Sequence, residues 1–169
     1  MPTLAEIISR TRRNHGLEHA TIHVLSQRYP DTFLAGHSDA GGFWLLGDVP
    51  TEAVASAVQE AERRLRNGER HLAIHPGCGT NYLVSGGLTA AAGALAMWGA
   101  GKNWRDKMER LPLALTLGTL ALMFSQPLAY RLQENATTDG DLGTLRVVEI
   151  VPSRRGRMAA HRVVTAFEP

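Results

Sequence analysis

The chain has 169 residues, and its 18 Lys and Arg nearly balance its 16 Asp and Glu, so the formal net charge is +2. This balance argues against a dedicated nucleic-acid-binding protein, which would carry a basic stripe with interleaved aromatic residues. A hydrophobic content of 44% excludes a disordered chain, and the single cysteine excludes an intramolecular disulfide framework. We therefore expect a folded protein whose globular part lies in a reducing compartment.

The first eighty residues predict a small α+β domain. Thr3 and Glu6 match the T-x-x-E pattern of a capping box, so a helix should begin there and end before Pro30. The apolar runs at 32–36 and 42–46 are separated by a polar turn, which is typical of a β-hairpin.

A second helix is expected after this hairpin. It opens at Pro50-Thr51 and stops at Gly68, where glycine commonly terminates a helix. The string HLAIH at 71–75 is interpreted as a short strand. The domain at 1–80 is therefore predicted in the order helix, strand, strand, helix, strand.

Two long uncharged runs follow. The segments at 82–100 and 111–130 are each close to the roughly 20 residues that a membrane-spanning helix needs. Trp98 and Trp104 flank the short charged loop between them, as interfacial aromatic residues do. We predict a two-helix transmembrane hairpin over 81–131. A buried hairpin of a soluble protein and a dimer interface are the alternatives.

The first run is rich in Gly and Ala. Gly87 with Ala91, and Ala92 with Ala96, are pairs of small residues four positions apart, which let a partner helix approach closely. Besides the lipid bilayer, we therefore expect a membrane-protein partner or a second copy of the chain at these faces.

The remaining segment, 132–169, predicts a β-hairpin of strands at 145–151 and 158–167. An isolated hairpin is marginal in water, so these strands are expected to join the N-terminal sheet.

Localisation is predicted from what the N-terminus lacks. It has neither the basic start nor the apolar stretch of a secretory signal. The basic residues on the two sides of the hairpin nearly balance and decide little. The missing signal and the single cysteine favour the bacterial inner membrane, with both termini in the cytoplasm.

The residues best suited to chemistry fall in two clusters. His15, Glu18 and His19 follow the order H-x-x-E-H, which on a helix places both histidines on one face, where they can bind one Zn²⁺. In the inverted zinc-peptidase motif the glutamate is the general base. His75 and Cys78 form the second cluster and have the ligand chemistry to complete the site.

Two roles are open for a metal bound there. In the catalytic role, Glu18 activates a metal-bound water for peptide hydrolysis. In the structural role, His15, His19, His75 and Cys78 fill all four ligand positions. A short motif is weakly specific, no downstream glutamate ligand can be identified, and a glycine inside the motif weakens a helix by about 1 kcal/mol, so catalysis is the less favoured role. A metal-free accessory subunit of a larger membrane complex is the alternative class.

Three strings carry a resemblance to a known family. They are R-N-H-G-L-E-H-A-T-I-H at 13–23, S-D-A-G-G-F at 38–43 and H-P-G-C-G-T-N at 75–81. With these the chain resembles an uncharacterised family of small bacterial membrane proteins, with cyanobacterial and Chloroflexi members. The resemblance implies an N-terminal domain followed by a membrane hairpin, and it implies no activity.

Overall fold

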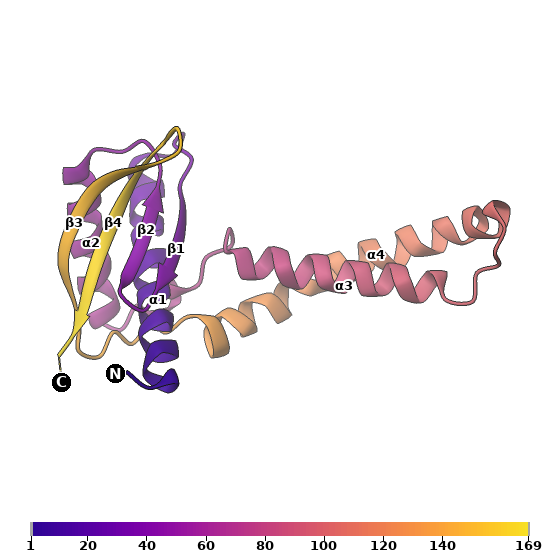
Figure 1. Cartoon of the computed structure of the whole chain (residues 1–169), viewed down its shortest axis with the longest axis horizontal. Helices are drawn as coiled ribbons and strands as arrows, with labels where there is room; N and C mark the ends of the chain where they lie inside the picture. Colours follow the sequence, from indigo (N-terminus) through magenta and orange to yellow (C-terminus); the bar gives the residue numbers. More distant parts are fainter. Residues whose placement is uncertain (1, 169) are drawn as a thin grey trace. The chain divides into compact units, whose positions relative to one another are not determined.

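The computed structural model describes residues 2–168 and divides into two compact units (Figure 1). The first, which we call the α+β unit, consists of Met1–His75 and Glu134–Pro169. The second, the hairpin unit, is Pro76–Gln133 and is inserted into the first in sequence.

Two helices of the α+β unit cover one face of its sheet (Figure 1). Helix α1 (Leu4–Arg28) begins at the predicted capping box. Thr3 Oγ1 accepts from the Glu6 amide at 3.3 Å, and the Thr3 amide donates to Glu6 Oε2 at 2.6 Å. Helix α2 (Thr51–Arg66) buries an apolar stripe at helical spacing, which explains why this segment packs as a helix.

The sheet has four antiparallel strands in the order β1-β2-β4-β3. They are β1 (Ala35–Asp39), β2 (Gly42–Leu46), β3 (Leu145–Arg155) and β4 (Met158–Phe167). Because β2 pairs with β4, the C-terminal hairpin belongs to the N-terminal sheet, as predicted. The mixed α+β class is thereby confirmed.

The core lies between this sheet and the two helices. Leu17 and Leu25 of α1 are fully buried, as are Phe43 and Leu45 of β2 and Val58 of α2. Burying each such side chain contributes about 1.5–3 kcal/mol, so this core supplies the main stabilisation of the α+β unit.

The strand predicted at 71–75 was wrong. The chain instead forms a 3₁₀ turn, η1 (Arg70–Ala73), closed by hydrogen bonds from the Leu72 amide to Glu69 O and from the Ile74 amide to His71 O, both 3.1 Å. Leu72 and Ala73 are both buried. Consecutive buried residues do not fit a strand whose side chains alternate between a buried and an exposed face.

The hairpin unit consists of α3 (Gly79–Met97) and α4 (Trp104–Leu132), which pack along each other; η2 (Gln133–Thr137) continues the chain into the α+β unit. Polar side chains pair within the hairpin: Ser85 Oγ lies 2.6 Å from Ser125 Oγ, and Gln133 Nε2 donates to Asn81 Oδ1 at 2.5 Å. Ala96 is buried, whereas a Cβ at Gly87 would meet no atom within 4 Å. Docking of a partner helix on the Gly87 face stays a prediction.

The prediction of two membrane spans was wrong for the first of them. Among the described residues, one helical segment, Trp104–Thr137, is long and apolar enough to cross a membrane, and an 18-residue window within it has a mean hydropathy of 1.4. Helix α3 falls short because Gly, Ala, Thr and Asn make up much of its length, and these residues are weakly apolar or polar. The hairpin therefore contains one candidate membrane helix, α4.

Candidate metal site

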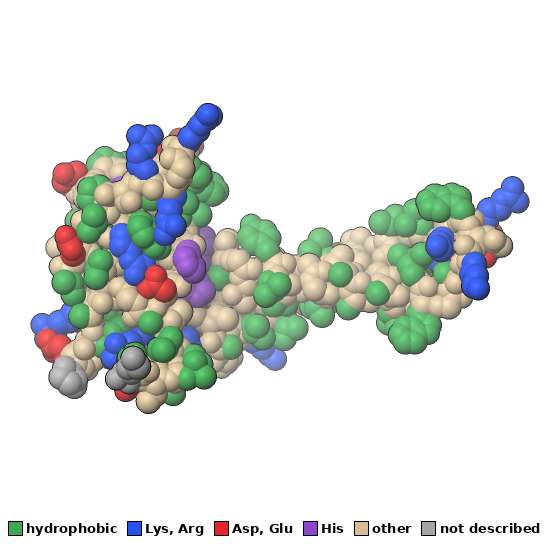
Figure 2. All heavy atoms as spheres, viewed as in Figure 1, with side chains coloured by type: hydrophobic (Ala, Val, Ile, Leu, Met, Phe, Trp, Pro, Cys, Tyr) green, Lys and Arg blue, Asp and Glu red, His purple; other side chains and the backbone are tan. Residues whose placement is uncertain are grey.

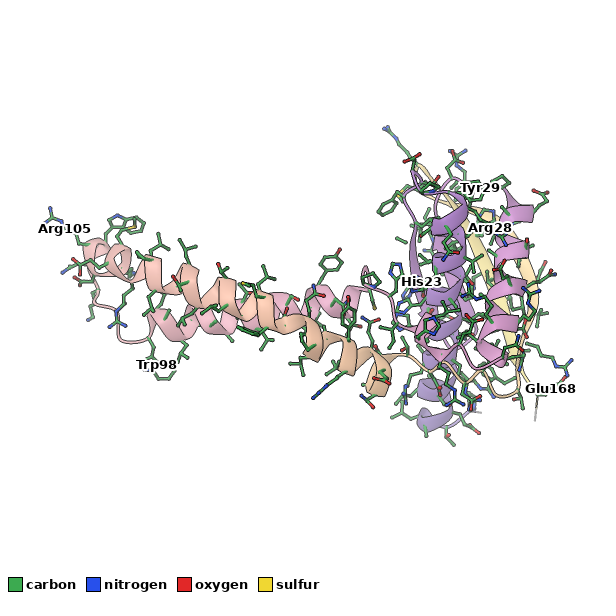
Figure 3. The ribbon with its side chains drawn as sticks, turned by 180° about the vertical axis from the view of Figure 1, so that it is seen from behind. His23, Arg28, Tyr29, Trp98, Arg105 and Glu168 are labelled. Atoms are coloured by element: carbon green, nitrogen blue, oxygen red, sulfur yellow. The ribbon has the colours of Figure 1, made fainter. Side chains whose placement is uncertain are left out.

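Three histidines lie at four-residue intervals along one side of α1. The ring centroids of His15 and His19 are 4.3 Å apart. His75, which follows η1, has its ring centroid 5.7 Å from that of His19 and 4.8 Å from that of His23 (His23 is marked in Figure 3). We call these four residues the histidine cluster. His19 is buried, and the other three are half-buried.

Each histidine of α1 bonds a backbone carbonyl of the α+β unit. His15 Nδ1 lies 2.9 Å from Thr137 O, and His19 Nδ1 lies 2.7 Å from Ala73 O. His23 Nε2 lies 2.8 Å from Ile74 O. A carbonyl oxygen only accepts, so the nitrogen facing it must carry the proton.

These hydrogen bonds assign the tautomers of the neutral rings. In His15 and His19 the lone pair is on Nε2, and in His23 it is on Nδ1. Histidines that bind metals usually donate their other ring N–H to a carbonyl or carboxylate in this way, which fixes the ring orientation. The cluster is thus organised as metal-binding histidines are.

His75 is held in its neutral form. Burial, reinforced by the nearby His23 and His19 rings, lowers the pKa of His75 to about 4. Since a metal binds the unprotonated ring, this lowered pKa keeps His75 available as a ligand at neutral pH.

Cys78 is the N-cap residue of α3, three residues after His75, and its side chain is buried. His15, His19 and Cys78 form a group of residues that could hold a metal ion. Imidazole and thiolate suit Zn²⁺ but also other transition metals, so the donor types do not fix the metal.

Glu18 faces the sheet. The residue is 3% exposed, and its carboxylate accepts a hydrogen bond of 2.5 Å from Ser38 Oγ of β1. A Cβ at Gly36 would lie 2.1 Å from Glu18 Oε1, so glycine is needed there to make room for the carboxylate. Burial raises the pKa of Glu18, while the Ser38 hydrogen bond and the charge of His15 oppose that rise.

Two residues of this region, His23 and Asn14, were not among the predicted site residues. His23 continues the spacing of His15 and His19 by one more turn, and that spacing was the available signal. Asn14 is fully buried; its Nδ2 donates to Asp39 O, and its Oδ1 accepts from Thr165 Oγ1, both at 2.8 Å. Asn14 lies three residues before Leu17, and this helical spacing could have predicted that Asn14 is on the buried face of α1.

Gly16 has a packing role. A Cβ there would lie 2.2 Å from Asp139 O, so only glycine lets the chain that follows η2 cross α1 this closely. The glycine inside the H-x-x-E-H string, which weakened the helix prediction, is explained by this contact.

The family model of the domain of unknown function DUF6391 matches residues 10–150. The chain belongs to this family, which confirms the expected membership of an uncharacterised family. An uncharacterised protein of the bacterium Picosynechococcus sp. (strain PCC 7002) is 42% identical over 107 residues, covering 58% of this chain and 52% of that protein. The chain thus matches about half the length of this relative. No solved structure matches.

Proposed function

We propose that this chain is a membrane-attached metal-binding protein, and that it holds one Zn²⁺ with His15, His19, Cys78 and His75. The pairing of His15 with His19 carries the proposal. Their rings are neighbours on α1, and each has its Nδ1 on a backbone carbonyl, so both lone pairs lie on Nε2. Two such rings and a thiolate give a donor set that Zn²⁺ binds with tetrahedral geometry.

The environment of Glu18 supports a structural metal over a catalytic one. A general base must reach a metal-bound water. Glu18 instead accepts from Ser38 and packs against Gly36 of β1. With four protein ligands, the ion would fasten α1 to the segment that contains His75.

A metal-dependent peptidase is the second candidate, and the raised pKa of Glu18 favours it, because a general base works best when its pKa is near the working pH. The Glu18→Gln variant separates the roles. Peptide hydrolysis that is present in the zinc-loaded wild type and lost in this variant, with zinc retained, would establish the enzyme. Absence of hydrolysis from both zinc-loaded proteins supports the structural role.

Metal content tests the proposal. The full chain, extracted in mild detergent, would be measured by elemental mass spectrometry alongside His19→Ala and Cys78→Ala. His37→Ala is the matched control, because His37 is exposed on β1 and outside the histidine cluster. About one zinc per chain is expected in the wild type and the control and much less in the other two. A folded wild type without metal would contradict the proposal.

Membrane attachment is proposed through α4. Only 11% of its most apolar window is buried. Figure 2 shows apolar side chains over the visible face of the hairpin and basic ones at its loop end. Trp98 and Arg105 both lie at that loop end (Figure 3), where an inserted hairpin would meet the far interface. The large exposed apolar residues of α4 are Trp104, Met108, Leu111, Leu113, Leu115, Leu120, Leu122, Met123, Phe124, Leu128 and Leu132.

This proposal includes the bacterial inner membrane as the location. Both connections of the hairpin leave it at the end opposite its loop, so an inserted hairpin would keep both chain termini on one side. We assign that side to the cytoplasm, because a sequence with a single cysteine cannot form an intramolecular disulfide, which suits a reducing compartment.

An alkaline wash of isolated membranes tests attachment. Wild type should stay in the pellet, and a Leu115→Asp/Leu122→Asp variant should be depleted from it, because each aspartate costs about 2.5–3.5 kcal/mol at the centre of a membrane helix. Leu4→Asp/Ile8→Asp is the control, since these two residues are exposed on α1 of the α+β unit. Release of the wild type into the supernatant would contradict membrane insertion.

A further inference from the structure

The histidine side of α1 also holds the chain segment that leads into the hairpin unit. His19 donates to Ala73 O at 2.7 Å, and His23 donates to Ile74 O at 2.8 Å. Ala73 is the last residue of η1, and Ile74 follows it. His75 comes next and is the last residue of the first part of the α+β unit. We call 70–75 the entry segment.

The segment that leads back from the hairpin unit is held one turn earlier on the same helix. His15 donates to Thr137 O at 2.9 Å. Arg12 Nη2 donates to Asn135 O at 3.1 Å and to Thr138 O at 3.0 Å, and the Asp139 amide donates to Arg12 O at 3.0 Å. We call 134–139 the exit segment.

Neither segment is held in the sheet. The entry segment is a single 3₁₀ turn, and the exit segment begins as one turn of π-helix and continues as irregular chain. Histidine rings bond α1 to both segments: His19 and His23 bond the entry segment, and His15 bonds the exit segment alongside Arg12. Two of the three rings, His15 and His19, are ligands in the proposed metal site.

In His15 and in His19, the two ring nitrogens would therefore bind different partners. Nδ1–H holds a segment carbonyl, and Nε2 would hold the metal. A metal on Nε2 fixes the ring plane and makes the opposite N–H a stronger donor, so each bond to a carbonyl becomes harder to open.

We propose that metal binding at the histidine cluster fastens the entry and exit segments to α1 together, so that the site is a metal-responsive clasp on both connections of the hairpin. This inference rests on the proposed metal site and adds its regulatory consequence. Without the ion the two segments open from α1 by local fluctuation, and with the ion they stay closed.

Hydrogen–deuterium exchange of the full chain in detergent tests this. The protein would be compared after chelation and after addition of one equivalent of Zn²⁺, with bound zinc quantified in the same samples. Amides that report on the segments include those of Ile74, bonded to His71 O, and Asp139, bonded to Arg12 O. Peptides covering 70–75 and 134–139 should exchange about tenfold or more slowly with zinc, corresponding to local opening that is harder by about 1.4 kcal/mol or more. Peptides of β2 and β4 should be unchanged.

The outcomes separate the two proposals. Bound zinc with slower exchange in both segments supports the clasp. Bound zinc with unchanged exchange in either segment overturns the clasp and leaves the metal site standing. Absence of bound zinc overturns both. The His37→Ala variant should respond as the wild type does, and loss of the response in that variant would assign the effect to zinc bound elsewhere and overturn the clasp.

Discussion

The polar side chains buried along α1 are all engaged in hydrogen bonds. Asn14 bridges β1 and β4, Glu18 accepts from Ser38, and His19 donates to Ala73 O. Leaving such a group buried and unpaired costs about 1–3 kcal/mol, so each side chain positions α1 as well as offering chemistry. The polar character of the 13–19 string is therefore accounted for in part by packing, which weakens the inference from that string to catalysis.

Stability should depend on pH through His161. This residue of β4 is 4% exposed, and its Nε2 lies 3.1 Å from Thr51 Oγ1. Burial lowers the pKa of His161, so the folded state takes up this proton less readily than the unfolded chain, whose histidine has a pKa of about 6.5. The contribution of His161 to the free energy of unfolding is therefore full above about pH 6.5 and declines as the pH falls through the window below it.

Chemical unfolding of wild type and His161→Gln at a series of pH values checks this. Between pH 8 and pH 5 the wild type should lose more stability than the variant, because the variant lacks the titrating group. The exposed His37→Gln variant should follow the wild type. Parallel curves for wild type and His161→Gln would contradict a neutral, buried His161.

Among individual residues, the sequence predicted contacts only between residues that lie close together in the chain. His15 and His19 were paired because four residues make about one helical turn. The carbonyls of Ala73 and Thr137 could not be predicted, because they depend on how η1 and η2 pack on α1. The direction of Glu18 toward β1 depends in the same way on the sheet.

Two glycines within helices, Gly16 and Gly87, should respond oppositely to substitution by alanine, as measured by the free energy of unfolding. Alanine is favoured over glycine in a helix by about 1 kcal/mol. At Gly16 the added Cβ would lie 2.2 Å from Asp139 O, so Gly16→Ala should lower the free energy of unfolding by roughly 1–3 kcal/mol despite that preference. At Gly87 the space is open, so Gly87→Ala should be neutral or stabilising.

Thermal unfolding of both variants in the same detergent measures this contrast. A lower midpoint for Gly16→Ala and an unchanged or higher one for Gly87→Ala is expected. Equal midpoints would mean that the exit segment moves away from α1 at little cost.

Elements with strong local signals were predicted well. The capping box defined the start of α1, and the second strand of the N-terminal hairpin was predicted at the bounds of β2. The first strand was predicted at 32–36, which was wrong by three residues, because β1 is Ala35–Asp39 and the polar residues 37–39, expected in the turn, pair with β2. The other two failures have physical causes. Residues 71–75 contain only three consecutive apolar positions, and so short an apolar run does not distinguish a strand from a 3₁₀ turn that buries Leu72 and Ala73. The run at 82–100 is uncharged, but absence of charge is not the same as apolarity.

At the scale of the whole molecule, the hairpin unit is an insertion into a unit with its own core. Ala73 O bonds His19, and Thr137 O bonds His15. His15 and His19 are one helical turn apart on α1, which is about 6 Å along the helix axis. The two ends of the insertion are therefore close together on the α+β unit. A chain in which a short Gly-Ser linker replaces 76–133 should fold, remain in the supernatant and unfold in a single transition.

Solubility, circular dichroism and thermal unfolding of this shortened chain check the prediction. An aggregated or unfolded product would mean that the α+β unit needs the hairpin for its stability. The shortened chain lacks Cys78, so it should also bind zinc more weakly than the full chain.

X-ray absorption at the zinc edge of the full chain, loaded with one equivalent of zinc, would identify the ligand atoms of a metal held by the α1 histidines and Cys78. We expect one sulfur at about 2.3 Å and imidazole nitrogens at about 2.0–2.1 Å, with the sulfur lost in Cys78→Ser. A first shell of oxygens without sulfur or imidazole, or failure of the folded protein to retain zinc, would contradict the proposed metal site.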